Sequence, residues 1–203
     1  MVDRSVTRWR RCLRGLHLGV ILILASTPAV GHTQPAKPGV AVDPLVSLRV
    51  GHWVTLDGVQ EPGRPVLCTS LRRLAGDLLD EDWSLKGLVK AVDADRQEFS
   101  IAGCRIRVNQ QTVYGHPNKT FSRFADIRAG MVIEAEGSFL RDGALLAAEI
   151  DDDSHEAARQ PNLRDHVELL GVIERIDVRK RLVTVMGIEF RISEKTRVRS
   201  AIH

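Results

Sequence analysis

The stretch GLVKAVDADRQEFSIAGCRIRVNQQTV, residues 87–113, decides the fold, because a second version of it, GVIERIDVRKRLVTVMGIEFRISEKTR, occupies residues 171–197. The two stretches align without a gap, which is the signature of an internal repeat. Matched positions are glycine, aspartate or threonine at turns and apolar residues between them: Gly87 with Gly171, Val89 with Ile173, Val92 with Ile176, Asp93 with Asp177, Gly103 with Gly187, Ile106 with Phe190, Val108 with Ile192 and Thr112 with Thr196. We name this segment half-unit A.

A second repeated segment, half-unit B, precedes each copy of half-unit A. LRVGHWVTLDG from Leu48 aligns without a gap with IRAGMVIEAEG from Ile127, and the match continues to Leu71 and Ile150. Gly51, Val54 and Gly58 match Gly130, Ile133 and Gly137. The chain therefore has the order B, A, B, A, with linkers near residues 73–82 and 151–165.

Both half-units have the pattern of β-strands, since apolar and polar residues alternate between glycine or aspartate turns. Half-unit A predicts strands at 88–92, 98–102 and 104–108, and half-unit B predicts strands at 131–136 and 144–150. Residues 122–128 predict a short helical turn between them. Three strands, a helical turn and two further strands are the order of a five-stranded OB-type barrel. We therefore predict an all-β fold of tandem small OB-like barrels.

Only one A is followed by a complete B, which leaves a half-unit at each end of the repeat region. Neither half buries its apolar face alone, so we expect the two end halves to complete a second barrel together. The alternative is two consecutive B-A units, which would place residues 48–71 against 87–108. The predicted organisation is a signal peptide at 1–31, a linker at 32–44, half-unit B at 45–74, a complete barrel at 83–152, a linker at 153–165 and half-unit A at 166–203, which can pair with 45–74.

The N-terminal segment is typical of a secretory signal peptide. An apolar run at 16–25 follows five arginines (Arg4, Arg8, Arg10, Arg11 and Arg14) and precedes small residues at 29–31. We predict a periplasmic or secreted protein with no membrane span after cleavage; Arg10-Arg11 also permits a twin-arginine signal. Residues 1–31 hold five arginines and one aspartate, so their removal takes +4 from the chain's +3 and leaves about −1. A near-neutral chain makes nucleic acid an unlikely partner.

Four motifs resemble a bacterial family of exported repeats, the domain of unknown function 5666: Val50-Gly51-His52-Trp53-Val54, Leu85-Lys86-Gly87-Leu88-Val89, Ile101 to Val108, and Gly143 to Ile150. The resemblance covers nearly all of the chain after residue 31. It implies an OB-like β-barrel in the bacterial envelope. The motifs consist of glycines and apolar positions, so they indicate a fold and no chemistry.

The candidate ligand-binding residues are Arg105, Arg107 and Tyr114 in the complete barrel, on the face that OB barrels use. The repeat has Glu189 and Arg191 where the barrel has Arg105 and Arg107, so no binding face common to both barrels is expected. The alternative interpretation of these residues is an ordinary solvated strand face.

Other polar residues give weaker indications of a site. The run Asp151-Asp152-Asp153 with His155 and Glu156 offers oxygen ligands but lacks the spacing of a calcium loop. His52, His116 and His166 lie in different half-units. Cys68 and Cys104 align with Ala147 and Ile188, so we interpret both thiols as core residues, although an oxidising compartment would permit a disulfide.

We therefore predict a non-enzymatic protein with no cofactor and no metal. Catalytic motifs such as a nucleophile elbow or a phosphate loop do not occur in the sequence. The predicted function is a binding or protein-interaction module in the bacterial envelope, with an envelope protein or an oligosaccharide as candidate partners. The alternatives are a periplasmic metal-homeostasis or stress factor and a nucleic-acid-binding OB protein.

Overall fold

The computed structural model describes residues 43–75, 83–115 and 121–199. The predicted signal peptide at 1–31, almost all of the linker at 32–44 and the candidate ligand His116 lie outside these residues. Within the described ranges, no helix is both long and apolar enough to cross a membrane.

The described chain is all-β, as the sequence predicts. Its strands form one mixed sheet. They fall into two groups, one from the middle of the described chain and one from its two ends. We name residues 83–152 the central module and residues 43–75 with 166–199 the terminal module. The central strands are β3 (Trp83–Asp93), β4 (Glu98–Ile101), β5 (Cys104–Arg107), β6 (Val113–Gly115), β7 (Val132–Phe139) and β8 (Ala144–Asp152). The terminal strands are β1 (Trp53–Val59), β2 (Val66–Arg73), β9 (His166–Asp177), β10 (Leu182–Val185), β11 (Ile188–Arg191) and β12 (Arg197–Arg199).

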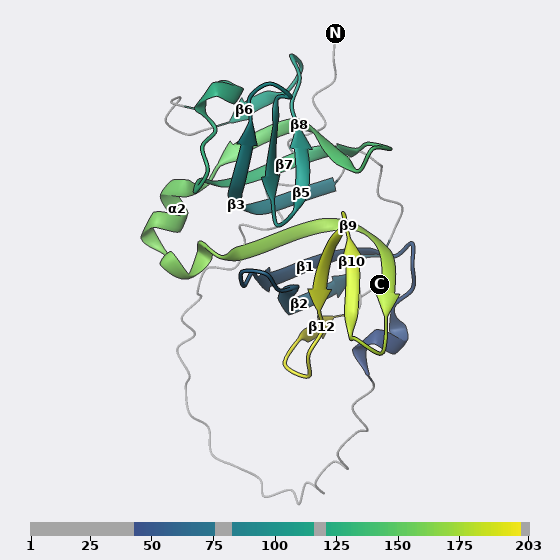
Figure 1. Ribbon diagram of the computed structural model, residues 1–203. Coiled ribbons are helices and arrows are strands. Elements are labelled where there is room, and N and C mark those ends of the chain that lie inside the picture. Colours follow the sequence, from purple (N-terminus) through teal and green to yellow (C-terminus); the bar gives the residue numbers. More distant parts are fainter. Residues whose placement is uncertain (1–42, 76–82, 116–120, 200–203) are drawn as a thin grey trace, which may run out of the picture. The chain divides into compact units, whose positions relative to one another are not determined.

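Short helices accompany the strands of both modules (Figure 1). They are η2 (Pro44–Ser47), η3 (Phe124–Asp126), α2 (Ser154–Arg159) and η4 (Pro161–Leu163). The helical turn predicted at 122–128 corresponds to η3. The linker predicted at 153–165 contains α2 and η4, which join β8 to β9.

In the central module the strand pairings form a closed cycle. β3 pairs with β4, β4 with β5, β5 with β8, β8 with β7, and β7 with β3; the β5–β8 pairing is parallel and the others are antiparallel. Side chains alternate across these strands, and β3 buries every second residue from Trp83 to Val89. The buried set forms the apolar interior that the period of two predicts.

The terminal module repeats this cycle with strands from both ends of the described chain. β9 pairs with β10, β10 with β11, β11 in parallel with β2, β2 with β1, and β1 with β9. Residues 53–59 thus pair with 166–172, which is the contact expected if the two end half-units complete each other. The register also matches, because Val54 lies opposite Gly171 and its counterpart Ile133 lies opposite Gly87.

Strand β9 connects the two cycles, because it pairs with β1 and β10 of its own module and with β3 of the central module (Figure 1). The β3–β9 pairing extends over Ser84 with Leu170, Leu85 with Leu169, and Lys86 with Glu168. We name this contact the seam. One cluster of buried apolar side chains runs through both modules.

The structure corrects several predicted boundaries. β3 begins at Trp83 rather than Leu88, because its first residues pair with β7 and β9, a contact that sequence alternation cannot reveal. β8 runs to Asp152, so Asp151 and Asp152 belong to a strand and not to the linker. The short parallel strands β6 and β12 were not predicted; they follow the shared threonines Thr112 and Thr196.

Those threonines have a structural role that explains why both repeats contain one. The Thr112 hydroxyl is buried and donates to the carbonyl of Ala147 at 2.7 Å, and the Thr196 hydroxyl donates to the carbonyl of Cys68 at 2.8 Å. The Thr112 hydroxyl therefore fixes the start of β6 to β8, and the Thr196 hydroxyl fixes the start of β12 to β2.

Candidate functional site

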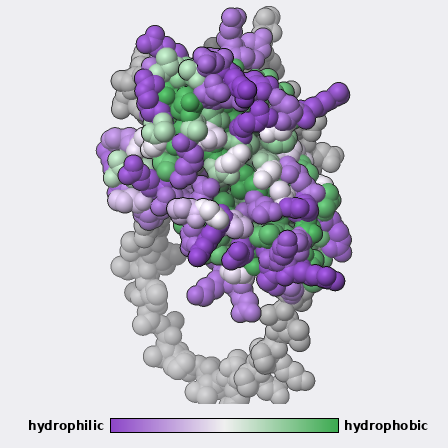
Figure 2. All heavy atoms as spheres, viewed as in Figure 1, coloured by the Kyte–Doolittle hydropathy of each residue, from purple (hydrophilic) through white to green (hydrophobic). Residues whose placement is uncertain are grey.

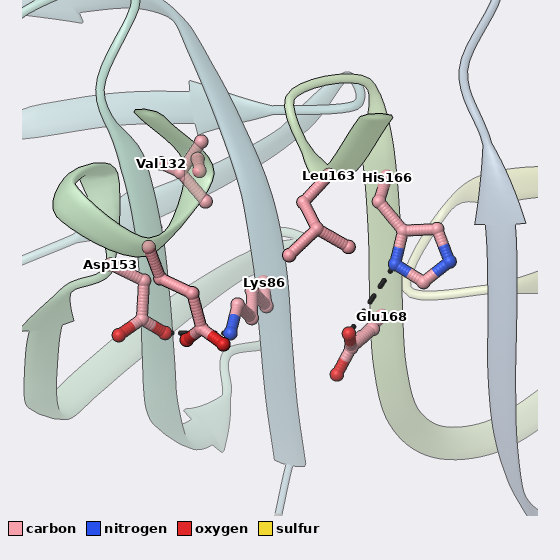
Figure 3. Close-up of a pocket in the computed structure, with 8 residues that line it drawn as sticks. Lys86, Val132, Asp153, Leu163, His166 and Glu168 are labelled. Carbon is pink, nitrogen blue, oxygen red and sulfur yellow. Dashed lines mark ion pairs between the residues drawn. The ribbon is translucent and has the colours of Figure 1, made fainter. Parts of the chain in front are cut away.

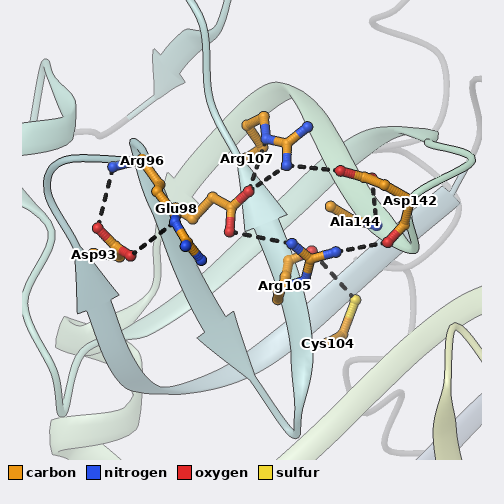
Figure 4. Close-up of polar contacts among 8 residues, drawn as sticks. All are labelled: Asp93, Arg96, Glu98, Cys104, Arg105, Arg107, Asp142 and Ala144. Carbon is orange, nitrogen blue, oxygen red and sulfur yellow. Dashed lines mark hydrogen bonds and ion pairs between the residues drawn. The ribbon is translucent and has the colours of Figure 1, made fainter.

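The first candidate site is a network of four charged side chains on the outer face of the β4–β5 hairpin (Figure 4). Glu98 lies opposite Arg107 in the register, and Ser100 lies opposite Arg105. Because side chains of directly opposed residues share a face, Glu98 and both arginines project to the same side. Asp142, in the turn between β7 and β8, completes the network.

Glu98 is the buried centre of this network, with a side chain that is 7 % exposed. The Arg107 Nε donates to Glu98 Oε1 at 2.8 Å, and Arg107 Nη2 lies 2.8 Å from Asp142 Oδ2. Arg105 Nη1 lies 3.5 Å from Glu98 Oε2, and Arg105 Nη2 donates to the Asp142 carbonyl at 2.6 Å. Two guanidinium groups are therefore held in fixed orientations between two acids.

The electrostatics of the network follow from these contacts. Hydrogen bonds to Glu98, and then to Asp142, raise the pKa of Arg107. The hydrogen bond from Arg107 lowers the pKa of Asp142. The network pairs two arginines with two acids, so its formal charges balance.

Tyr114 lies in a different cluster. It sits on β6 opposite Ile150 of β8, and its ring packs edge-on against Phe121 with centroids 5.5 Å apart. Burial raises the pKa of its phenol. The structure thus joins two of the three predicted ligand-binding residues, Arg105 and Arg107, and places Tyr114 with Phe121 instead.

The terminal module has no equivalent network among its described residues. The sequence counterparts of Glu98, Arg105, Arg107 and Asp142 are Leu182, Glu189, Arg191 and Gly63. There, Glu189 accepts a hydrogen bond from Arg175 at 2.6 Å. Among the described residues, the arginine network therefore belongs to the central module alone.

The second candidate site is a row of charged residues across the seam, which sequence analysis missed. The register places Glu134 of β7 beside Lys86 of β3, Lys86 beside Glu168 of β9, and Glu168 beside Asp57 of β1. Sequence inspection could not find this row, because its members come from four strands of both modules and only the pairing register aligns them.

A small hollow opens beside this row (Figure 3). It is lined by Lys86, Asp153, Glu156, His166 and Glu168, with Val132, Ala157 and Leu163 as its apolar part. The Lys86 Nζ lies 2.7 Å from Asp153 Oδ2, and His166 Nδ1 lies 3.3 Å from Glu168 Oε1.

Residues 86–151 match the family described as a domain of unknown function (DUF5666). The resemblance that the sequence motifs suggest is confirmed for this stretch, which begins at Lys86 in β3 and ends within β8. No curated protein and no solved structure matches the chain.

Both the arginine network and one half of the charged row lie inside the DUF5666 region. Arg105, Arg107 and Asp142 fall within it, as do Lys86 and Glu134. The other half of the row, Glu168 and Asp57, comes from the terminal module. The seam therefore combines residues inside and outside the region that the family model describes.

The cysteines are placed as core residues. Cys104 in the DUF5666 region and Cys68 in the terminal module are both free and buried. Burial raises the pKa of each thiol to about 12. A thiol is nucleophilic only as the thiolate, so neither cysteine has the environment of a reactive residue.

The described histidines and the acidic run were candidates for a metal centre. Among the described residues, no group of three or more His, Cys, Asp or Glu side chains is arranged to hold a metal ion. His52 Nδ1 accepts a hydrogen bond from the Arg49 amide at 3.2 Å, and burial lowers the pKa of this imidazole. Asp153 forms an ion pair with Lys86 at the hollow.

Proposed function

We propose that this chain is an exported, non-enzymatic binding protein made of two OB-like barrels, and that its central barrel binds an acidic peptide segment of a partner protein in the bacterial envelope. The proposal combines an N-terminal segment typical of export signals with the position of the arginine network in the central module. The proposed ligand site depends on the position of the network.

The pairing order supports the OB-like part of the proposal. Leaving out the short β6 and β12, we number the strands of each module from the start of half-unit A, which gives β3, β4, β5, β7 and β8 in the central module and β9, β10, β11, β1 and β2 in the terminal module. In each module the first strand then pairs with the second and fourth, and the third pairs in parallel with the fifth. OB barrels bind their ligands on the face of strands two and three, between the loop that follows strand one and the loop that joins strands four and five. β4 and β5 are strands two and three of the central module, and Asp142 lies in the loop that joins strands four and five, β7 and β8. The arginine network thus occupies the position that OB barrels use.

The exposure of the network favours a carboxylate ligand. The side chains of Arg105, Arg107 and Asp142 are 43 %, 34 % and 45 % exposed. Asp142 is a loop carboxylate in an exposed ion pair, and such pairs contribute only about 0–1 kcal/mol. A carboxylate of a partner can therefore replace Asp142 at small cost, while buried Glu98 keeps both guanidinium groups oriented for bidentate contact.

The same network disfavours nucleic acid as the ligand. Binding to phosphates requires uncompensated basic groups along a track, together with aromatic rings on which bases stack. Here the two arginines form a single pair on β5 rather than a track, and Tyr114 packs against Phe121. Hydrophilic and hydrophobic side chains are also interspersed over the visible face of the molecule in Figure 2. An acidic peptide, which needs two oriented cations and little else, fits the network better.

The test is a ligand panel on the chain from His32 onward. The panel contains oligoglutamate, oligoglutamine of the same length, a uronic-acid oligosaccharide and a short oligonucleotide, each followed by melting temperature and by calorimetric titration. A ligand that binds the folded state raises the melting temperature, by an amount equivalent to about 2.7 kcal/mol at 100 times its Kd. Oligoglutamate should give the shift and oligoglutamine should not.

Variants assign any shift to the network. Arg105→Gln with Arg107→Gln should abolish oligoglutamate binding, whereas Arg191→Gln, at the matching position of the terminal module, should leave it unchanged. A shift with the uronic-acid oligosaccharide alone would replace the peptide by an acidic glycan. A flat panel, or binding that survives the double substitution, would contradict the proposed site. Export is tested separately by N-terminal sequencing of protein from the envelope fraction, with cleavage expected near residues 29–31.

A further inference from the structure

The outer side of the seam concentrates carboxylates around one lysine. Lys86 has Glu134 as its register neighbour on one side and Glu168 on the other, and it lies 2.7 Å from Asp153. Glu134 belongs to the central module and Glu168 to the terminal module. Lys86 therefore holds together acids from both modules, which would otherwise repel one another across the seam.

Taken together, the described titratable groups around Glu134 include more acids than bases. The titratable residues that act on it or lie opposite it are Lys86 on β3, Glu136 on β7, Asp151 on β8, Asp153 in the linker and Glu168 on β9. Glu156 and His166 line the adjoining hollow together with Lys86 and Glu168, and Asp57 lies one strand further on. Lys86 and His166 are the cations of this set, and His166 is one only when protonated.

Glu134, His166 and Asp57 all have raised pKa values. Burial raises the pKa of Glu134 to about 7, with the carboxylates of Glu136, Asp153 and Glu168 acting in the same direction and Lys86 against them. The hydrogen bond to Glu168 raises the pKa of His166. Burial also raises the pKa of Asp57, and the Glu168 carboxylate adds to this effect.

Aromatic side chains of both modules also meet at the seam. Trp83 of the central module lies 5.1 Å from Trp53 of the terminal module and 5.2 Å from Phe139, measured between ring centroids. Its ring also packs over Gly171, where a Cβ atom would lie 2.7 Å from the Trp83 ring. A movement at the seam therefore changes the surroundings of both tryptophans.

We propose that the seam is a pH-responsive joint, in which the two modules are held together firmly in mild acid and loosen when Glu134 ionises. The backbone contact across the seam extends over only three residue pairs, so the modules rely on the side chains on either side of it. In mild acid Glu134 is neutral and His166 is cationic, so the excess of negative charge at the seam is smallest. At alkaline pH Glu134 is an anion and His166 is neutral, so acids of the two modules repel each other across β3 and β9.

The direct test is hydrogen exchange of the full chain, followed by mass spectrometry at a series of pH values. After correction for the intrinsic pH dependence of exchange, protection at 84–86 and 168–170 should fall about tenfold between about pH 6 and about pH 8.5, with a midpoint near 7. Peptides of the β4–β5 and β10–β11 hairpins, which lie away from the seam, serve as internal controls and should keep their protection.

The tryptophan pair gives an independent optical readout. In a Trp9→Phe background Trp53 and Trp83 are the remaining tryptophans of the chain. Their near-ultraviolet circular dichroism should change with the same midpoint as the exchange at the seam. Glu134→Gln should remove the transition and retain the acid form at all these pH values, whereas Glu189→Gln, a strand glutamate paired with Arg175 away from the seam, should leave it unchanged.

A second variant keeps the test decisive if Glu134→Gln does not fold. Lys86→Met removes the ammonium that favours ionised Glu134, so the midpoint should move to higher pH. The proposal is overturned if seam protection in the wild-type chain is independent of pH over this range. It is also overturned if folded Glu134→Gln retains the transition, or if the midpoint of Lys86→Met stays in place.

Discussion

Leu85 lies directly opposite Leu169, its own counterpart in the repeat, at the centre of the β3–β9 pairing. The two copies of half-unit A therefore meet about a local twofold axis, and their backbones contribute equally to the seam. The two flanking pairs have different side chains, because Ser84 faces Leu170 on one side and Lys86 faces Glu168 on the other. The charge that makes the seam sensitive to pH thus comes from the positions at which the two repeats differ.

Gly137 tests how the fold depends on the shared glycines. A Cβ atom at this position would lie 2.0 Å from the Leu146 carbonyl oxygen, at the point where the β7–β8 register shifts. We expect Gly137→Ala to destabilise the protein by about 3 kcal/mol or more, since the clash is with backbone. Urea unfolding measures this.

Gly143→Ala is the matched control for this prediction. Its added methyl group meets nothing within 4 Å, but its φ of +80° is unfavourable for alanine. A cost of only about 1 kcal/mol is expected from backbone strain. If the two variants were equally stable, close approach of β7 and β8 at Gly137 would not be what requires glycine there.

The glycines also show how far the sequence predicts the fold. Gly58 and Gly137 align in the repeat. Gly58 lies at a register shift between β1 and β2, and Gly137 lies at one between β7 and β8. The repeat and the alternation of apolar residues predict the all-β class, most strand positions and the opposition of the end half-units. They do not predict that β3 extends back to Trp83, because that extension exists only through pairing with β7 and β9.

The candidate site was predicted less completely. The outward positions of Arg105 and Arg107 follow from strand alternation, but the partners Glu98 and Asp142 depend on the register and on a loop. The sequence prediction puts Tyr114 with the arginines on the face that OB barrels use. Its strand β6 instead pairs with β8, and this removes Tyr114 to a separate aromatic cluster.

Arg107 should contribute to stability through the burial of Glu98. In Arg107→Ala the carboxylate of Glu98 keeps its buried position, loses its closest partner and retains Arg105. Leaving a buried acceptor without its partner costs about 1–3 kcal/mol, and the exposure of Arg107 favours the lower half of that range. Adding Glu98→Leu, the residue of the terminal module, should restore most of the loss.

Arg191→Ala provides the comparison at the matching position of the terminal module, where Leu182 stands in place of Glu98. Its effect on the free energy of unfolding should stay within about 0.5 kcal/mol. Equal losses in Arg107→Ala and Arg191→Ala would mean that the ion pair with Glu98 adds nothing to stability.

The two buried thiols should be protected from alkylation in the folded chain. With pKa values of about 12, Cys68 and Cys104 hold only about one part in ten thousand of thiolate at about pH 8. In the chain from His32 onward, iodoacetamide should modify neither residue within hours, and both within minutes after unfolding in guanidinium. Intact-mass spectrometry counts the adducts, and fast labelling of the native chain would show that the thiols are accessible.

Global stability should be greatest in mild acid, and the signs of three shifts give the window. Glu134 and His166 have raised pKa values in the folded chain, so the folded state binds more protons than the unfolded state above their ordinary values of 4.5 and 6.5. Stability therefore falls as pH rises from 4.5 through about 7 and beyond. The hydrogen bond from His166 lowers the pKa of Glu168, so its contribution is lost as pH falls below 4.5.

Urea unfolding across this range should thus give a maximum near pH 4.5 and a decrease of about 2 kcal/mol by about pH 8, reduced from the full linkage value because Glu134 is only partly buried. His166→Asn should flatten the part of the decrease above 6.5 and leave the part that belongs to Glu134. Glu189→Gln should preserve the whole profile. A stability maximum above pH 7 would mean that the carboxylates of the row are ionised and well compensated in the folded chain, so that the seam carries no excess of negative charge.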